Sequence, residues 1–233
     1  MIRYERYARQ TMLPEIGPQG QRRLLDASVL IVGLGGLGSP AALYLAGAGV
    51  GRIGLADPDT VSESNLQRQV LYDSTQTGRP KTEAARERLA ALSPHTRFEC
   101  HPQGLRPDNA ADMVAAYDLV LDCCDNFATR YLIDDACTAC GKPWVHGSIG
   151  EFLGQVGVFN HRRGRHYADL YPDREQLCAR PPASSGVLGA LPGVIGAMQA
   201  AEAVKIIVGF GEPLDGRLLT IDMRNMQSET IEL

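Results

Sequence analysis

The sequence predicts one α/β domain with a doubly wound, mostly parallel sheet that antiparallel strands extend toward the carboxyl terminus. Three observations predict this fold. Residues 28–33 form an uninterrupted apolar run, which is typical of a strand covered on both faces. A glycine-rich turn and a helical segment follow directly, and strands and helices alternate over the first two thirds of the chain. The alternation then stops, and closely spaced apolar runs indicate antiparallel pairing.

The elements follow in order along the chain. Residues 37–48 are expected to form a helix that Ser39 caps, with Pro40 at the first helical position. Further elements of the alternating part are helices at 81–92 and 127–140 and strands at 52–57, 97–100, 118–123 and 143–147. A strand at 153–159, a helix at about 193–208 and strands at 217–222 and 227–232 complete the domain. The single domain, residues 1–233, thus comprises a helical arm (1–27), a core (28–150) and an extension (151–233).

Two segments of the extension stand out. Residues from about 161 to 185 lack periodicity and are rich in Arg, Asp and Pro, which predicts a long, mobile surface loop. Residues 186–210 are apolar enough to suggest a membrane span, but Pro192, Gln199, Glu202 and Lys205 interrupt them. We interpret this stretch as a buried or interface helix.

Composition narrows the class of protein. Apolar residues make up 44% of the 233 residues and charged residues 21%, which excludes a disordered chain. The net charge of −4 offers no basic surface for nucleic acid. Six cysteines, with Cys123 and Cys124 adjacent, indicate a reducing compartment and not a disulfide scaffold. With no signal-peptide pattern at the amino terminus, we expect a cytoplasmic protein that binds neither nucleic acid nor membrane.

The glycine turn predicts a Rossmann-like nucleotide site. Gly33-Leu34-Gly35-Gly36-Leu37-Gly38 lets backbone N–H groups approach a phosphate at a helix amino terminus. Asp57 ends the next strand, 19 residues after Gly38, where a carboxylate can accept hydrogen bonds from ribose hydroxyls. This pattern alone does not separate a dinucleotide from ATP, and a turn that merely packs helix on strand also has it.

Polar residues after the second strand favour a triphosphate. Asn65 and Arg68 are three residues apart and share one side of a short helical turn, and Lys81 begins the next helix. An amide and two cations beside the glycine turn suit ATP better than the lower charge of a dinucleotide. Either cation alone would more often be a solvated surface residue, but the three residues together favour a nucleotide site.

Asp125 is the candidate metal ligand. It lies in Cys123-Cys124-Asp125-Asn126, at the carboxyl end of a strand, where ligands bind in open α/β sheets. Its carboxylate supplies the hard oxygen that Mg²⁺ prefers. The alternative is a cap for the helix at 127–140, and the two roles are compatible.

Several separate motifs resemble those of the ThiF/MoeB/HesA adenylyltransferases, bacterial relatives of the ubiquitin-activating enzymes, and the zinc-free ThiF-like members most closely. The motifs are Arg6-Tyr7-Ala8-Arg9-Gln10, the glycine turn, Asn65-Leu66-Gln67-Arg68-Gln69, Gly78-x-x-Lys81, Cys124-Asp125-Asn126, Gly186-x-x-Gly189, Pro192-x-x-x-Gly196 and Gln199-x-x-Glu202. They cover nearly the whole chain. By position, the resemblance assigns nucleotide and catalytic roles to Gly35, Gly36, Asp57, Asn65, Arg68, Lys81 and Asp125, and Gln69 belongs to the same motif.

The resemblance implies ATP-dependent adenylation of a ubiquitin-like sulfur carrier that ends in Gly-Gly, with release of pyrophosphate. We expect a ThiS-type carrier of thiamine thiazole synthesis, with a MoaD-type carrier of molybdenum cofactor synthesis as the alternative. The resemblance also implies a cysteine desulfurase as sulfur donor and a homodimer in which Arg9 reaches into the partner subunit's site. Because the carrier carboxylate is ionised at pH 7, Arg9, Arg68, Lys81 and Mg²⁺ on Asp125 would suffice without a general base. The extension would bind the carrier.

Two rival classes have weaker support. A nicotinamide-dependent oxidoreductase is supported only by the glycine turn and Asp57. A non-catalytic scaffold for a ubiquitin-like partner is disfavoured because Arg9, Arg68, Lys81 and Asp125 are all present.

The cysteines depart from the family pattern. Many relatives hold zinc on two Cys-x-x-Cys pairs, but His166 and Asp169 stand where the first pair would lie, and we expect no structural zinc. Cys137 and Cys140 have metal-ligand spacing but are interpreted as core residues one helical turn apart. Cys178, in the expected loop beside Arg180, is a candidate nucleophile toward the adenylated carrier, with an incidental loop cysteine as the equal alternative.

Overall fold

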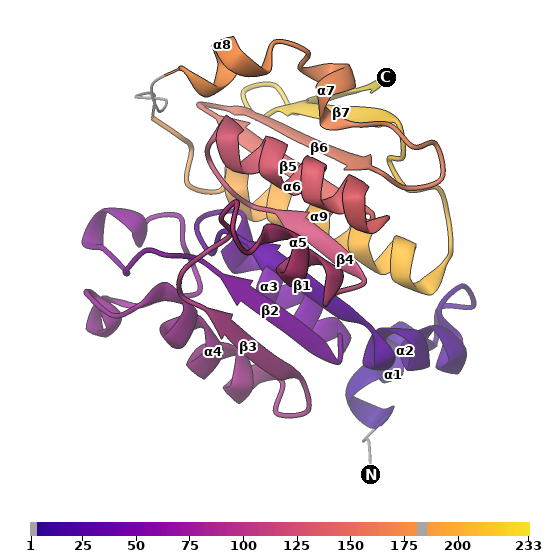
Figure 1. Ribbon diagram of the computed structural model, residues 1–233. Coiled ribbons are helices and arrows are strands. Elements are labelled where there is room, and N and C mark those ends of the chain that lie inside the picture. The colour runs from indigo at the N-terminus through magenta and orange to yellow at the C-terminus, as the bar shows by residue number, and fades with distance from the viewer. Residues whose placement is uncertain (1–3, 181–185) are drawn as a thin grey trace.

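Within the described residues, one sheet of eight strands runs through the molecule in the order β3-β2-β1-β4-β5-β6-β7-β8. The computed structural model describes residues 4–180 and 186–233 (Figure 1). Strands β1 to β5 pair in parallel, and β6, β7 and β8 continue the sheet in antiparallel pairs. The strands are β1 (Ser28–Val32), β2 (Arg52–Ala56), β3 (Arg97–His101), β4 (Leu119–Asp122), β5 (Trp144–Gly150), β6 (Leu153–Phe159), β7 (Arg217–Asp222) and β8 (Gln227–Glu232). The predicted fold class is confirmed.

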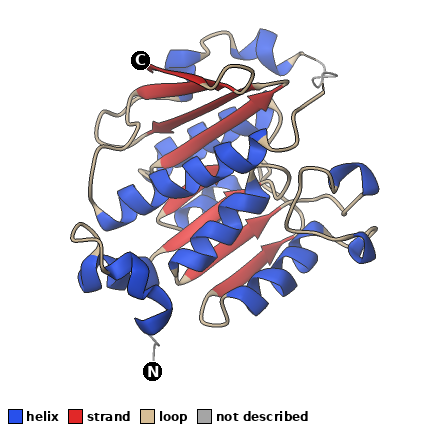
Figure 2. Ribbon diagram, turned by 180° about the vertical axis from the view of Figure 1, so that it is seen from behind, coloured by secondary structure: helices blue, strands red, loops and turns tan. Residues whose placement is uncertain are grey.

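Helices cover both faces of the parallel part of the sheet (Figure 2). The helices are α1 (Ala8–Thr11), α2 (Gly17–Asp26), α3 (Gly38–Ala48), α4 (Lys81–Leu92), α5 (Ala110–Ala115), α6 (Phe127–Cys140), α7 (Tyr167–Leu170), α8 (Arg174–Cys178) and α9 (Leu191–Val208), with short 3₁₀ turns η1 (Tyr4–Tyr7), η2 (Glu63–Asn65) and η3 (Ser74–Gln76). Helix α3 packs against α4 and α9, and α6 packs against α5, α7 and α8.

The core is split by the sheet into two apolar clusters. In β1, Val29 and Ile31 face the cluster with α3 and α9, whereas Leu30 and Val32 face the cluster with α5 and α6. All five residues of β1 are buried. This two-sided burial is the physical reason for the continuous apolar run in the sequence.

Several local expectations were wrong. Ser39 does not cap α3; the helix begins one residue earlier, at Gly38, and the buried Ser39 hydroxyl donates to the Leu34 carbonyl oxygen at 3.4 Å. The expected loop at 161–185 contains α7 and α8, and Tyr167 of α7 is fully buried because it packs into an aromatic cluster with Trp144 and Phe159. Residues 181–185 lie outside the described residues. Mobility of this segment stays a prediction.

Helix α9 is the one helix in the described ranges that is long and apolar enough to cross a membrane. Half of it is buried within the molecule, where it packs on α3, β5 and β6. Its Gln199 donates to the carbonyl oxygens of Asp122 and Val145, and its Glu202 accepts the N–H of Leu214. These contacts place the buried half of α9 in the core, in agreement with the first of the two predicted alternatives, and the interface alternative stays a prediction.

Candidate functional site

The glycine turn joins β1 to α3 at the carboxyl edge of the sheet. Gly33 has a φ of +92°, and a Cβ there would lie 2.6 Å from the carbonyl oxygen of Cys123. A Cβ on Gly38 would lie 2.0 Å from the carbonyl oxygen of Gly33. These two glycines are therefore required by the fold itself. No side chain caps the amino terminus of α3. The Ser39 N–H donates to the Gly35 carbonyl oxygen and Pro40 has no N–H, so within the described residues the N–H groups open to an anion are those of the turn, from Gly35 to Gly38.

Strand order places this turn at the topological switch point of the sheet. Connections from β1 lead outward to β2 and β3, whereas β4 lies on the other side of β1 and leads to β5. The residues that follow β1 and β4 thus flank one crevice, which is where open α/β sheets bind ligands. The contact between Gly33 and Cys123 lies at this point.

Asp57 supports the turn from the neighbouring strand. Its two carboxylate oxygens accept the N–H groups of Leu34 at 2.7 Å and Asp59 at 2.8 Å. The Lys81 ammonium lies 2.9 Å from Asp59 and 3.7 Å from Asp57. Tyr72 donates its hydroxyl to the Leu34 carbonyl oxygen, and burial, with the nearby Asp57 and Asp59 charges, raises the pKa of this hydroxyl far above its ordinary value. Asp57 therefore contacts the turn directly, and Lys81 is linked to the turn through its ion pair with Asp57.

Asn65, Arg68 and Gln69 lie on one short turn beside the glycines. The carbonyl oxygen of Asn65 accepts the N–H groups of Arg68 and Gln69, which confirms the expected helical turn. The Arg68 side chain passes 3.7 Å from where a Cβ on Gly36 would lie, and its guanidinium donates to the carbonyl oxygen of Ser64. Gln69 is buried, and its Oε1 has no hydrogen-bond partner within the described residues.

Asp125 follows β4 across the crevice and is exposed to solvent. Asn126, and not Asp125, caps α6, because Asn126 Oδ1 accepts the N–H of Thr129 at 2.9 Å. The alternative interpretation of Asp125 as the cap of this helix is therefore wrong, and its carboxylate remains available for a ligand. One carboxylate suits Mg²⁺, which proteins hold through one or two carboxylates while substrate phosphates and water complete its shell.

Sequence reasoning missed a buried polar cluster directly behind Asp125. Asp122, the last residue of β4, accepts a hydrogen bond from His146 Nδ1 at 2.7 Å, and its other oxygen accepts the N–H of Cys124 at 3.1 Å. Arg130 Nε lies 3.6 Å from Asp122. Burial alone would raise the pKa of Asp122, but the hydrogen bond from His146 and the charge of Arg130 lower it below its ordinary value. A polar residue inside each of two apolar strands was the signal that could have revealed the pair.

Two expected catalytic residues are not joined to this site within one chain. Arg9 is exposed on α1, and its neighbour Gln10 contacts Ala48 at the carboxyl end of α3. Since α3 has 11 residues, this contact lies about 16 Å of helix away from the glycine turn. Cys178 is exposed at the end of α8, and no hydrogen bond within the described ranges links it to the turn or to Asp125.

The residues at the position of the family's first zinc pair are used locally. Asp169 accepts the N–H of His166 at 2.9 Å at the start of α7, and His166 Nδ1 lies 3.1 Å from the Thr138 hydroxyl. Cys137 is buried in the core and Cys140 partly buried, as predicted. In the part of the chain that the structure describes, no three His, Cys, Asp or Glu side chains gather as a metal site.

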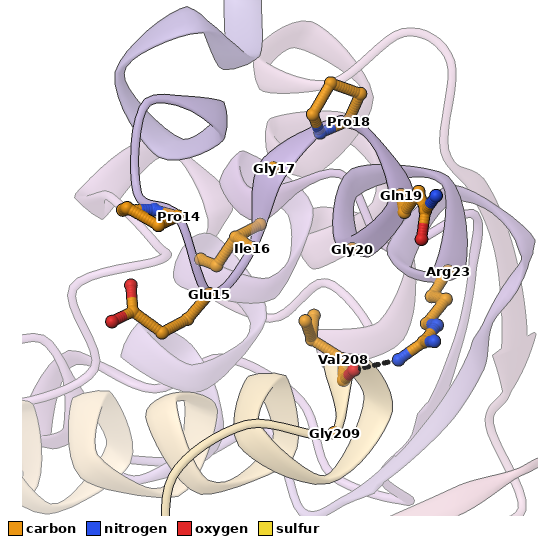
Figure 3. Close-up of a pocket in the computed structure, with 10 residues that line it drawn as sticks. All are labelled: Pro14, Glu15, Ile16, Gly17, Pro18, Gln19, Gly20, Arg23, Val208 and Gly209. Atoms are coloured by element: carbon orange, nitrogen blue, oxygen red, sulfur yellow. Dashed lines mark hydrogen bonds between the residues drawn. The ribbon is translucent and has the colours of Figure 1, made fainter.

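A surface pocket of about 350 Å³ lies away from these residues (Figure 3). It is formed by the segment 14–20 with Arg23, Val208 and Gly209, and the Arg23 guanidinium in it donates to the Val208 carbonyl oxygen. No predicted site residue lines it. The predicted site residues described above lie instead at the carboxyl edge of the sheet, around the switch point.

The ThiF family model matches residues 7–233. A sulfur carrier protein adenylyltransferase of Thermus thermophilus is 49% identical over 224 residues, which are 94% of this chain and 83% of that protein. The probable adenylyltransferase/sulfurtransferase MoeZ of Mycobacterium tuberculosis is 46% identical, over 98% of this chain and 59% of MoeZ. Adenylyltransferase and sulfurtransferase MOCS3 of Drosophila yakuba is 50% identical, over 93% of this chain and 48% of MOCS3. The chain thus spans about half the length of these last two relatives.

Solved structures share the fold. MccB of E. coli, solved with ATP, aligns with a TM-score of 0.82 at 23% identity, over 97% of this chain and 71% of that one. PaaA aligns with a TM-score of 0.84 at 23% identity, over 98% of this chain and 73% of that one. With the match across residues 7–233 and the identity to the Thermus protein, the chain belongs to the ThiF family.

Proposed function

We propose that this ThiF-family adenylyltransferase uses ATP to activate the carboxyl terminus of a ubiquitin-like sulfur carrier. The observation that carries the proposal is the convergence at the switch point of a glycine turn, the Arg68 and Lys81 cations, and the exposed Asp125 carboxylate. The names of the Thermus, MoeZ and MOCS3 relatives support the reaction class and the type of partner. The nicotinamide alternative has no comparable support.

Three further observations fit ATP at this site. The backbone N–H groups of the turn, from Gly35 to Gly38, have no partner within the described residues and are available to phosphates. The Gln69 side chain lies beside Gly35 with its Nε2 nearest, and its buried Oε1, without a partner among residues 4–180 and 186–233, can accept a hydrogen bond from a nucleotide. Lys81 pairs with Asp59, whose side chain is 67% exposed, so its ammonium can turn from that solvated carboxylate to a phosphate.

The reaction needs charge stabilisation more than proton transfer. An oxygen of the carrier carboxylate, ionised at neutral pH, attacks the α-phosphorus. A carboxyl–phosphate bond forms, the bond from the α-phosphorus to the bridging oxygen breaks, and pyrophosphate leaves. Arg68, Lys81 and the start of α3 stabilise the negative charge that builds on the phosphoryl oxygens. Mg²⁺ held by Asp125 would neutralise further phosphate charge.

Arg9 completes the site only from a second subunit in this proposal. The fold holds it near the carboxyl end of α3, away from the glycine turn of its own chain. A homodimer with two sites, each receiving the partner's Arg9, would bring this cation to the phosphates.

The antiparallel extension is the proposed carrier surface. A hollow of about 540 Å³ lies on β6, β7 and β8, lined by Leu153, Thr220, Ile221, Asp222, Gln227, Ser228 and Glu229. Phe152, Leu153 and Ile231 expose apolar side chains on the same strands and their turn. Exposed apolar surface of this kind marks protein interaction sites. From here, a Gly-Gly tail would extend to the crevice.

We propose a ThiS-type carrier, because His166 and Asp169 stand where many relatives carry the first Cys-x-x-Cys pair, and in this respect the chain resembles zinc-free ThiF-like proteins. The further proposals are a cysteine desulfurase as sulfur donor and Cys178 as a nucleophile toward the adenylate, in a reducing, cytoplasmic setting. ATP-pyrophosphate exchange with Mg²⁺, measured in parallel with a ThiS-type and a MoaD-type carrier, tests the function. Exchange with ThiS alone supports the proposal, exchange with MoaD alone corrects the pathway, and exchange with neither overturns both.

A further inference from the structure

The two halves of the crevice meet at the backbone of Cys123 and Cys124. Gly33 of the turn packs on the Cys123 carbonyl group, and Cys123 N–H donates to the Val32 carbonyl oxygen at 2.8 Å. Asp125 follows directly in the chain. A shift of this short segment would therefore displace the glycine turn and the candidate metal ligand together.

Side chains of β4, α6 and α9 hold this segment, and from α9 Gln199 Oε1 accepts the Cys123 thiol at 3.5 Å. Asp122 Oδ1 accepts both the N–H of Cys124, at 3.1 Å, and its thiol, at 2.7 Å. Arg130 of α6 donates to the Cys124 carbonyl oxygen at 3.0 Å. The peptide groups on both sides of Cys124 are thus fixed, and the carboxylate of Asp122 is central to the arrangement.

His146 orients that carboxylate. It lies on β5, directly beside Asp122 in the parallel pairing of the two strands, and Nδ1 is 2.7 Å from Asp122 Oδ2. Both side chains are fully buried. An ionised carboxylate only accepts, so Nδ1 carries the proton and donates it. Asp122 Oδ2 is engaged by His146 while Oδ1 engages Cys124, which defines the plane of the carboxylate.

We propose that His146 is a positioning residue that sets the geometry of Asp125 and the glycine turn through Asp122. This inference rests on the proposed function for its catalytic consequence. Its geometric part concerns only the chain itself. Without the donor at position 146, Asp122 would rotate to bring Oδ2 to Arg130 Nε, which lies 3.6 Å from it and has no hydrogen-bond partner within the described residues, and Oδ1 would release Cys124.

Matched substitutions separate the hydrogen bond from the bulk of the ring. His146→Asn places an amide nitrogen close to the position of Nδ1 and keeps the donor. His146→Gln carries its amide one bond farther, and His146→Leu fills the space without a donor. His101→Asn is the control, because His101 is a half-buried strand histidine whose Nε2 contacts Tyr117 at the other edge of the parallel strands.

Amide hydrogen exchange of the free protein is the first measurement, since it needs neither ATP nor a carrier. We expect His146→Leu and His146→Gln to speed amide exchange in the peptide over residues 120–130 by about tenfold or more. This factor corresponds to the free energy of one lost hydrogen bond to a charged group. His146→Asn and the His101→Asn control should retain wild-type exchange there. Faster exchange in β1 as well, or equal exchange in the Leu and Asn variants, would show a general packing role and overturn the inference.

Pyrophosphate exchange with whichever carrier supports it is the second measurement. We expect kcat to fall about 10- to 100-fold in His146→Leu, as for other residues that orient a metal ligand. The Mg²⁺ concentration for half-maximal rate should rise, the KM for the carrier should stay unchanged, and His146→Asn should restore kcat. Wild-type kcat in His146→Leu would overturn the catalytic role. If the wild-type protein itself shows no exchange with either carrier, the proposed function fails, and amide exchange alone decides the geometric part.

Discussion

Gly35→Ala tests whether the glycine turn binds phosphate or only packs α3 onto the sheet. In contrast to Gly33 and Gly38, Gly35 is not required by the fold. A Cβ there would meet only the Gln69 side chain, with its nearest atom at 3.4 Å, which is ordinary contact distance. Its φ is not in the left-handed region. An alanine should therefore stabilise the protein by about 0.4–1 kcal/mol and raise Tm by roughly 1–4 °C.

The same substitution should weaken ATP binding although it stabilises the protein. A methyl group between the turn and Gln69 would keep a phosphate from the backbone, and one hydrogen bond to a charged group contributes about 1.5–3 kcal/mol. We expect the KM for ATP in pyrophosphate exchange to rise about 10- to 150-fold, with calorimetric ATP binding weakened alike. Gly47→Ala in α3, the helix that follows the turn, is the control and should gain stability with unchanged KM, because an added Cβ there has no neighbour within 4 Å. If Gly35→Ala gains stability and retains its KM within about twofold, the turn has only a packing role.

The other predictions concern cations, histidine and zinc. Arg68→Ala should abolish exchange at unchanged Tm, because its guanidinium makes only an exposed bond to a carbonyl oxygen; retained exchange would remove Arg68 from the site. Mixing inactive Arg9→Ala and Arg68→Ala subunits should restore about a quarter of wild-type activity, since random pairing leaves one intact site in each mixed dimer; no recovery would contradict the shared site. Burial lowers the pKa of His146 in the folded protein below 6.5, so the unfolded chain binds a proton at this histidine at a higher pH than the folded chain does. The free energy of unfolding therefore decreases as the pH falls below about 6.5. His146→Asn should consequently lose less Tm than wild type between about pH 7 and about pH 5, and an equal loss would refute that. Elemental analysis should find no stoichiometric zinc, because His166 and Asp169 engage each other's peptide and neighbouring residues; one tightly bound equivalent would contradict this.

The strands of the parallel core could be predicted because burial on both faces leaves a continuous apolar run. Residues 28–33 correspond to β1, and Leu153–Phe159 and Gln227–Glu232 agree with the expected strand bounds. The start of α3 could not be located in the same way. Propensity favoured Ser39 as a cap, but in the structure glycines permit the helix to begin at Gly38, one residue before it.

The helices inside the expected loop were missed for a different reason. Segment 167–178 is short and polar, and its helices are stabilised by tertiary contacts that local sequence does not reveal. Tyr167 packs into the aromatic cluster on β5 and β6, and its N–H donates to Asp134 of α6. The polar composition therefore indicated a loop, although the buried Tyr167 holds this segment against the sheet.

The same difference between local and long-range contacts decides which residues of the candidate site could be predicted. Asn65, Arg68 and Gln69 were predictable as a group because one local turn brings them together. Asp122 and His146 are 24 residues apart, and each alone is only a polar residue in an apolar strand. Their pairing follows once β4 and β5 are known to be parallel neighbours in register, since equivalent residues then lie side by side. A buried carboxylate at the end of a strand needs a donor, and the adjacent strand of a parallel sheet is the nearest element able to supply one. Polar residues that interrupt two consecutive apolar runs at matching positions therefore indicate a pair that holds the strand end, and with it the residue that follows toward the ligand.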